Sequence, residues 1–252
     1  MFTCGLWAVL GIGFIFAMTS LGSAAVFLFL AGHSFALQRV TMGFSAGIMT
    51  AASVWSLLLP AIAQAEADLL APPWMPAAFG LLLGAFFLAG LELMQRRGEG
   101  ERRSLLFAAV TLHNIPEGMA VGAILAGLLS GEKGVTLAGA MMLSLGIALQ
   151  NIPEGTIISM PLCAGGMKKG KAAMYGLWSG LVEPLSAMLT IWATELIVPI
   201  LPYLLSFAAG TMIYVVASEL IPEIHEGEGK KKALLWLGLG FSIMMSLDVA
   251  LG

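Results

Sequence analysis

Long runs of apolar residues, separated by short polar breaks, constrain this chain more than any other feature of its sequence. We count eight runs, each close to or above the length of about 20 residues that a helix needs to cross about 30 Å of hydrocarbon. Only 11% of the residues are charged, against about 25% in a soluble domain. That scarcity excludes an ordinary cytosolic enzyme and a disordered chain, and the formal net charge of −3 argues against nucleic-acid binding.

The sequence therefore predicts an all-α polytopic membrane protein with one integral-membrane domain over residues 1–252. The first run has no basic segment before it and is longer than the apolar core of a signal peptide, so we count it as a span. The eight predicted transmembrane helices are Leu6–Leu30, Val40–Ala63, Trp74–Met94, Ser104–Ser130, Val135–Cys163, Ala172–Leu196, Pro199–Pro222 and Ala233–Leu251.

The basic residues predict the orientation of these spans. All but one of the 12 Lys and Arg residues lie in the loops after spans one, three, five and seven, and Lys133 is the exception. The positive-inside rule places those four loops in the cytoplasm and both termini on the extracytoplasmic side of the cell (inner or plasma) membrane.

Spans two and seven contain similar sequences that run in opposite directions through the predicted membrane. Phe44–Met49 reads FSAGIM and Phe207–Met212 reads FAAGTM, and a proline follows each segment at Pro60 and Pro222. We predict inverted repeats, formed by spans 1–3 and 6–8, around an antiparallel central pair, spans 4–5. Chance recurrence of small and apolar residues is the alternative explanation.

A stronger repetition lies in the two central spans. His113–Gly118 reads HNIPEG and Gln150–Gly155 reads QNIPEG, and both hexapeptides fall near the middle of their spans. At about 100° per residue, the first, second and fifth positions of each hexapeptide share one helix face. The side chains placed on these two faces are His113, Asn114 and Glu117, and Gln150, Asn151 and Glu154.

The charges inside the spans are all acidic. Glu117, Glu154 and Glu183 lie near mid-depth, and no Lys or Arg lies within any span. An ionised carboxylate at the membrane centre costs at least about 2.5–3.5 kcal/mol. These acids must therefore be protonated, hydrated in a cavity, or paired with a cation from outside the chain. A bound metal ion meets this need best, and protons come second.

The residue types narrow the choice of metal. The His113 imidazole with carboxylates, amide oxygens and the Met49 thioether suits a divalent transition metal, and bridging carboxylates suit one or two ions. These ligands do not distinguish Zn²⁺ from Cd²⁺, Fe²⁺ or Mn²⁺. Taken alone, Met49 is better explained as a core residue, and a lone buried His or Glu is usually a structural contact. The pairing of His113 and Glu117, repeated as Gln150 and Glu154, favours a functional site.

At these motifs the chain resembles the ZIP (Zrt-/Irt-like protein) family of divalent metal transporters, in particular its bacterial GufA-like branch. The resemblance implies a transported metal rather than a catalytic cofactor, and assembly as a homodimer. It also implies Met49 as a ligand, Asp248 near the outer entrance and Glu219 on the cytoplasmic exit side. The transport site that it implies comprises His113, Asn114, Glu117, Gln150, Asn151, Glu154 and Glu183.

The second motif departs from the family pattern. Gln150 stands where many members have His, and Asn151 stands where some have Asp. Each change removes an imidazole or a charge, which places the affinity of a second metal and the metal preference in question.

The expected function is uptake of zinc, or alternatively cadmium, iron or manganese, into the cytoplasm by alternating access. A metal-selective channel would use the same residues. A membrane-embedded metal hydrolase is the third hypothesis, but the sequence lacks a His-Glu-x-x-His pattern and a Ser-centred nucleophile motif. We therefore do not expect an enzyme. The predicted partners are a divalent cation and the lipid bilayer, with no nucleic acid.

Overall fold

The computed structural model describes residues 2–28, 35–68, 72–94, 99–131, 136–225 and 229–251, and every regular element in these ranges is helical. The elements are α1 (Phe2–Ala24), η1 (Ala25–Phe27), α2 (Phe35–Ala52), η2 (Ser53–Leu58), α3 (Leu59–Asp68), α4 (Trp74–Met94), α5 (Glu99–Ser130), α6 (Leu137–Ala164), α7 (Lys169–Gly180), α8 (Val182–Trp192), α9 (Thr194–Ile197), η3 (Val198–Ile200), α10 (Leu201–Val215), η4 (Val216–Leu220), α11 (Ile221–His225) and α12 (Lys230–Leu251).

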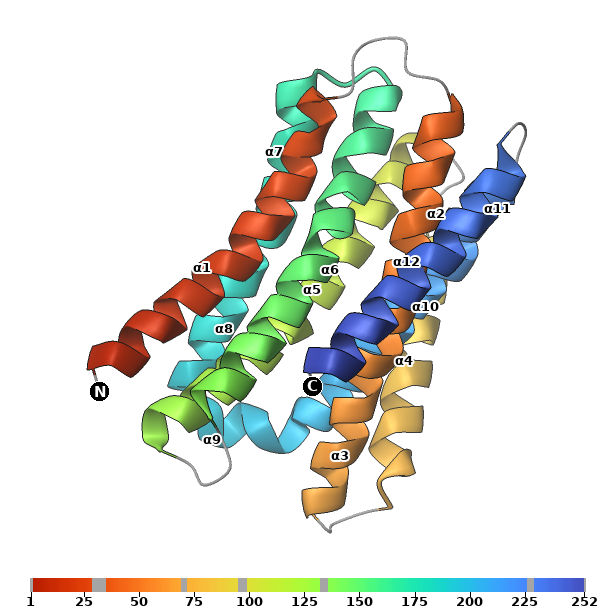
Figure 1. The fold of residues 1–252 in the computed structure, drawn as a ribbon. Helices are drawn as coiled ribbons and strands as arrows, with labels where there is room; N and C mark the ends of the chain where they lie inside the picture. Colours follow the sequence, from red (N-terminus) through yellow and green to blue (C-terminus); the bar gives the residue numbers. More distant parts are fainter. Residues whose placement is uncertain are drawn as a thin grey trace.

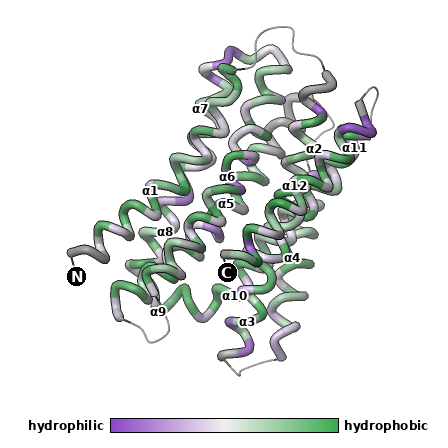
Figure 2. Tube along the Cα trace, viewed as in Figure 1, coloured by the Kyte–Doolittle hydropathy of each residue, from purple (hydrophilic) through white to green (hydrophobic). Residues whose placement is uncertain are grey.

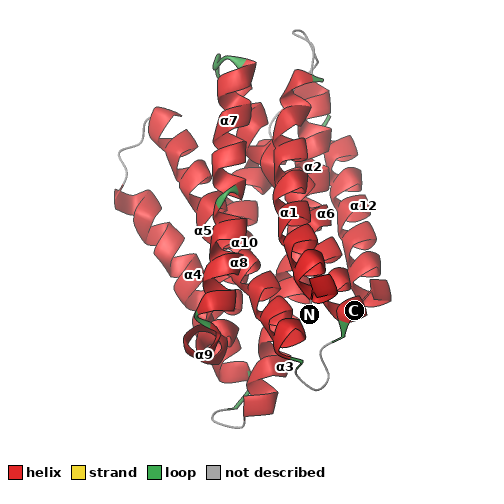
Figure 3. Cartoon of the chain, turned by 90° about the vertical axis from the view of Figure 1, so that its left-hand side faces the viewer, coloured by secondary structure: helices red, strands yellow, loops and turns green. Residues whose placement is uncertain are grey.

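The long helices form a bundle in which both chain termini lie at the same end (Figures 1 and 3). Within the described residues, six helical segments are long and apolar enough to cross a membrane. These six candidates are Gly5–Phe27, Arg39–Glu66, Trp74–Leu93, Val110–Ser130, Thr194–Leu220 and Lys230–Ala250. The structure therefore supports a polytopic all-helical membrane protein.

Two of the predicted spans are not among these candidates. The fifth corresponds to α6, which has 28 residues and carries the polar QNIPEG hexapeptide. The sixth is divided at Leu181 into α7, with 12 residues, and α8, with 11. Pro184 contributes to this division because it lacks the N–H that would bond to the Gly180 carbonyl.

The helices pack in closely approaching pairs, α1 with α6, α5 with α8, α2 with α12 and α4 with α10. Glycine makes each approach possible. A Cβ on Gly155 of α6 would overlap the Thr19 carbonyl oxygen of α1, and one on Gly47 of α2 would overlap the Leu237 carbonyl oxygen of α12. Small residues at helix contacts are the usual means of bringing backbones together in membrane proteins.

The two segments that share the FSAGIM-like sequence also share an interruption. After α2 the chain forms a π-helical turn, η2, and after α10 it forms a second one, η4. Each turn is followed by a proline, Pro60 or Pro222, which has no N–H to bond to the carbonyl four residues earlier. The prolines give a physical reason for the wider turn at both places.

The core runs through the middle of the bundle, whereas the outer faces are also apolar. Ile15, Met49, Leu57, Leu125 and Met212 are fully buried. By contrast, α4 exposes large apolar side chains along its outer face, as expected for contact with lipid. Hydrophobic residues colour most of each helix in Figure 2, and strongly hydrophilic colour gathers at helix ends, notably beside α7 and α11.

Candidate metal-binding site

The two hexapeptides lie on α5 and α6, which remain helical through Pro116 and Pro153. The polar side chains of the hexapeptides point inward. Asn114, Glu117, Gln150, Asn151 and Glu154 are all 0% exposed. His113 belongs to α5, but its side chain lies outside the described residues.

Glu183 joins this group from a different helix. It lies in the first turn of α8, directly after the division at Leu181, and it is 0% exposed. A helix N-terminus carries partial positive charge, which favours a carboxylate there. Glu117 and Glu154 are close enough for their charges to act on Glu183. Acids from three helices therefore converge in the interior.

Three donors from three helices hold the Glu183 carboxylate. The Thr19 hydroxyl of α1 donates to Glu183 Oε1 at 2.7 Å, and Asn114 Nδ2 of α5 donates to the same oxygen at 3.2 Å. Asn151 Nδ2 of α6 donates to Glu183 Oε2 at 2.7 Å. These three hydrogen bonds tie α1, α5 and α6 to α8.

Several amide atoms in the same region have no hydrogen-bond partner within the described part of the chain. They are Asn114 Oδ1, Asn151 Oδ1 and both polar atoms of the Gln150 side chain. Leaving such a buried group unsatisfied costs about 1–3 kcal/mol. A cation would satisfy the three amide oxygens and would offset the charges of Glu117 and Glu154, so the donor set fits a metal ion.

The acids do not by themselves form a closed metal cluster. Among the side chains that the structure describes, no three His, Cys, Asp or Glu residues come together as a ready cation site. The donors here are mixed instead, with amide oxygens from Asn114, Gln150 and Asn151 beside the carboxylates. Met49 of α2 is fully buried in the main core cluster, together with residues of α5 and α6.

The two outlying acids occupy different places. Asp248 of α12 accepts a hydrogen bond from Ser56 Oγ of η2 at 2.9 Å, and its Oδ2 has no partner among the described residues. Glu219 lies in η4, within electrostatic range of Tyr214. Tyr214 in turn donates a hydrogen bond to Glu92 of α4.

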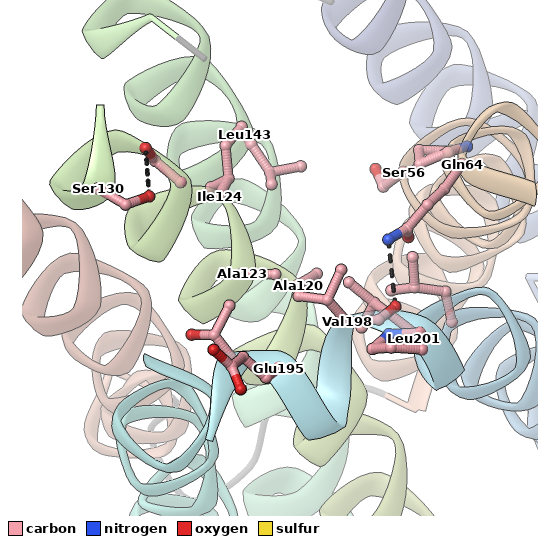
Figure 4. Close-up of a pocket in the computed structure, with 15 residues that line it drawn as sticks. Ser56, Gln64, Ala120, Ala123, Ile124, Ser130, Leu143, Glu195, Val198 and Leu201 are labelled. Atoms are coloured by element: carbon pink, nitrogen blue, oxygen red, sulfur yellow. Dashed lines mark hydrogen bonds between the residues drawn. The ribbon is translucent and has the colours of Figure 1, made fainter. Parts of the chain in front are cut away.

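A cavity of about 470 Å³ lies between α3, α5 and α9 (Figure 4). α3 and α9 are at the end of the bundle that holds both termini (Figure 1). The cavity reaches Ala120 on α5, less than one helical turn from Glu117, and it includes Ser56, the partner of Asp248. Figure 4 shows Gln64 donating to the Val198 carbonyl at 3.3 Å across this cavity, with Glu195 at its edge. The cavity thus connects one end of the bundle with the neighbourhood of the buried acids.

Comparison with known proteins identifies the family. A family model described as "ZIP Zinc transporter" matches residues 100–248. The chain is also 33% identical to "Zinc transporter ZIP11" of Homo sapiens, and the alignment covers 97% of each protein. The chain belongs to the ZIP zinc transporter family.

Bacterial ZIP proteins are similar to the chain at a comparable level. It is 36% identical to "Zinc transporter ZIPB" of Bordetella bronchiseptica, over 98% of this chain and 82% of that protein. It is 36% identical to "Zinc transporter GufA" of Myxococcus xanthus, over 69% of this chain and 71% of that protein. The predicted resemblance to the ZIP family and its GufA-like branch is confirmed, and these names state transport rather than catalysis.

Sequence reasoning missed three polar contacts of this ZIP protein. Thr19, Ser56 and Gln64 each contact another segment, and none belongs to a recognisable motif. Glu195, at the end of the predicted sixth span, was also not singled out, although it borders the cavity. The available signal was a polar side chain inside an apolar run, which does not by itself identify a partner.

Proposed function

We propose that this ZIP protein carries divalent transition-metal cations into the cytoplasm by alternating access. Zinc is the first candidate, with cadmium, iron and manganese as alternatives. The observation that carries the proposal is the buried group of Glu117, Glu154 and Glu183 beside amide oxygens, in spans that contain no Lys or Arg. A group of buried carboxylates at this depth favours a bound cation.

The proposed topology has eight spans, with inverted repeats around α5 and α6 and with both termini extracytoplasmic. Two findings support it. Both termini lie at one end of the bundle, as an even number of crossings requires (Figure 1). The paired π-helical turns η2 and η4 fall in the two segments of similar sequence. In this topology α6 and the divided α7–α8 segment supply the two spans that length and hydropathy alone do not identify.

The proposed path begins at the cavity beside α3 and α9. A cation would pass Asp248 and Ser56, reach the level of Ala120, and bind between α5 and α6. The proposed ligands, for one or two ions, are His113, Asn114, Glu117, Gln150, Asn151, Glu154, Glu183 and Met49. The ion would leave past Glu219, which lies beside α11 toward the opposite end (Figure 1).

Metal uptake into proteoliposomes tests the proposed site. Replacing Glu117 and Glu154 together by Ala should abolish Zn²⁺ uptake, because it removes two of the buried carboxylates that attract the cation. Glu66→Gln is the matched control, since Glu66 is an exposed acid on α3 and lies outside the proposed path. Full uptake by the double variant would refute the site.

The same liposomes test metal choice and coupling. Uptake of Zn²⁺, Cd²⁺, Fe²⁺ and Mn²⁺ is compared with inner and outer pH set independently. Saturable uptake with a strong temperature dependence supports a carrier. Flux that rises linearly with concentration and depends weakly on temperature would show a channel instead.

A further inference from the structure

The side-chain amides of Asn114 and Asn151 have no N–H left to donate. Asn114 Nδ2 donates to Glu183 Oε1 at 3.2 Å and to the Ser179 carbonyl at 3.4 Å. Asn151 Nδ2 donates to Glu183 Oε2 at 2.7 Å and to the Ile15 carbonyl at 3.3 Å. A primary amide has two N–H donors, so both protons of each amide are used.

These bonds fix which end of each amide faces away from Glu183. Each amide donates to Glu183 through its Nδ2, so the oxygen of each amide lies on the side away from Glu183. Both oxygens, Asn114 Oδ1 and Asn151 Oδ1, are buried without a hydrogen-bond partner in the described residues. The network therefore directs two amide oxygens, which can bind a cation, away from Glu183. The two NH₂ groups, which cannot bind a cation, face Glu183.

Glu183 keeps one lone pair for a metal while three donors hold its carboxyl group. Its Oε1 accepts from both Thr19 and Asn114, and its Oε2 accepts from Asn151. A carboxylate oxygen has two in-plane lone pairs, so one lone pair of Oε2 remains. Thr19 is the one donor of the three that carries no amide, and its hydroxyl holds Glu183.

We propose that Thr19 is a positioning residue, which acts on the transported cation by holding Glu183 and, through it, by orienting the oxygens of Asn114 and Asn151. This inference rests on the proposed function and adds a residue that holds one of its ligands, Glu183. The geometry of the site then depends on α1, because Thr19 ties that helix to α8 through Glu183. Loss of the Thr19 hydroxyl loosens Glu183 and lets an amide rotate, which replaces an oxygen ligand by an NH₂ group.

The first test compares three variants in Zn²⁺ uptake. Thr19→Val removes the hydroxyl at nearly constant volume. We expect KM to rise about 10-fold, which is the lower end of the effect of losing a residue that hydrogen-bonds to a metal ligand. Thr19→Ser should restore most of the affinity because it keeps the hydroxyl. Thr190→Val is the matched control, since Thr190 is equally buried and its hydroxyl donates to the Ser186 carbonyl of its own helix.

Calorimetric titration of Zn²⁺ into the detergent-solubilised protein should give the same order, with Kd rising for Thr19→Val but not for Thr190→Val. Thr19→Ala, which adds no methyl group at the α1–α8 contact, provides the same comparison if Thr19→Val does not fold. Equal KM and Kd values for the valine, alanine and serine variants at Thr19 would overturn the proposal.

A double-mutant cycle separates orientation from direct coordination. In a background with Asn114→Ala and Asn151→Ala, Thr19→Val should change Kd by less than about twofold, because the groups through which it acts are gone. A persisting 10-fold effect would show that Thr19 acts through Glu183 as a ligand, which refutes the orienting role. Absence of uptake by the unsubstituted protein would instead refute the proposed function.

Discussion

Gly118 on α5 is the position where one added methyl group should affect both packing and transport. A Cβ there would overlap the Glu183 carbonyl oxygen and Ser186 Oγ, and would lie 2.8 Å from Glu183 Cα. Carbon atoms pack at about 3.5–4.0 Å, so α8 must retreat by roughly 0.7 Å or more. The bond from Asn114 Nδ2 to Glu183 Oε1, now 3.2 Å, then lengthens toward about 3.9 Å, beyond hydrogen-bonding range.

We therefore expect Gly118→Ala to lower Zn²⁺ uptake at least about 10-fold, by disturbing a partner of the proposed ligands. Overpacking should cost about 1–3 kcal/mol of stability. The higher helix propensity of Ala offsets about 0.5–1 kcal/mol of that cost. The assays are uptake into proteoliposomes and the thermal midpoint in detergent.

Gly13→Ala is the matched control for this prediction. Gly13 is an exposed helical glycine of α1, and a Cβ there would meet nothing within 4 Å. This variant should transport normally and be equally or more stable. Uptake by Gly118→Ala at the level of Gly13→Ala would refute the reasoning, because it would show that the α5–α8 contact does not set the geometry of the site.

Three further predictions address the entrance, the orientation and the core. Asp248→Asn should raise KM for Zn²⁺ about fivefold with little change in maximal rate, because it removes an attraction of about 1 kcal/mol; an unchanged KM would exclude Asp248 from the path. In a chain with Cys4 and Cys163 replaced by Ser, Ala123→Cys should react with a membrane-impermeant maleimide from outside, and reaction only from inside would invert the topology. Leu57→Ala should lower stability by about 2–5 kcal/mol, measured by thermal unfolding in detergent, because Leu57 is 0% exposed.

The sequence by itself was sufficient to predict an all-helical polytopic membrane protein and its family, and to choose candidate site residues. Polar and charged groups are costly in lipid. Apolar runs of spanning length, and acids within them that have no Lys or Arg beside them, can therefore be recognised in the sequence. The hexapeptides HNIPEG and QNIPEG were sufficient to single out Asn114, Glu117, Gln150, Asn151 and Glu154, and all five are buried together. Local spacing on a helix is enough for such an inference because it fixes which residues share a face.

Only the tertiary structure decided which helices meet at those residues. Gly118 and Gly155 end the two hexapeptides, and the structure shows that they accommodate α8 and α1 respectively. It also shows that the Thr19 hydroxyl of α1 donates to Glu183 of α8, and that the Asn114 amide of α5 donates to the Ser179 carbonyl of α7. Helices that are apolar all round carry no periodic signal for which face is inside, so the sequence leaves their neighbours open. Pairing instead depends on small residues and single polar contacts between segments far apart in the chain.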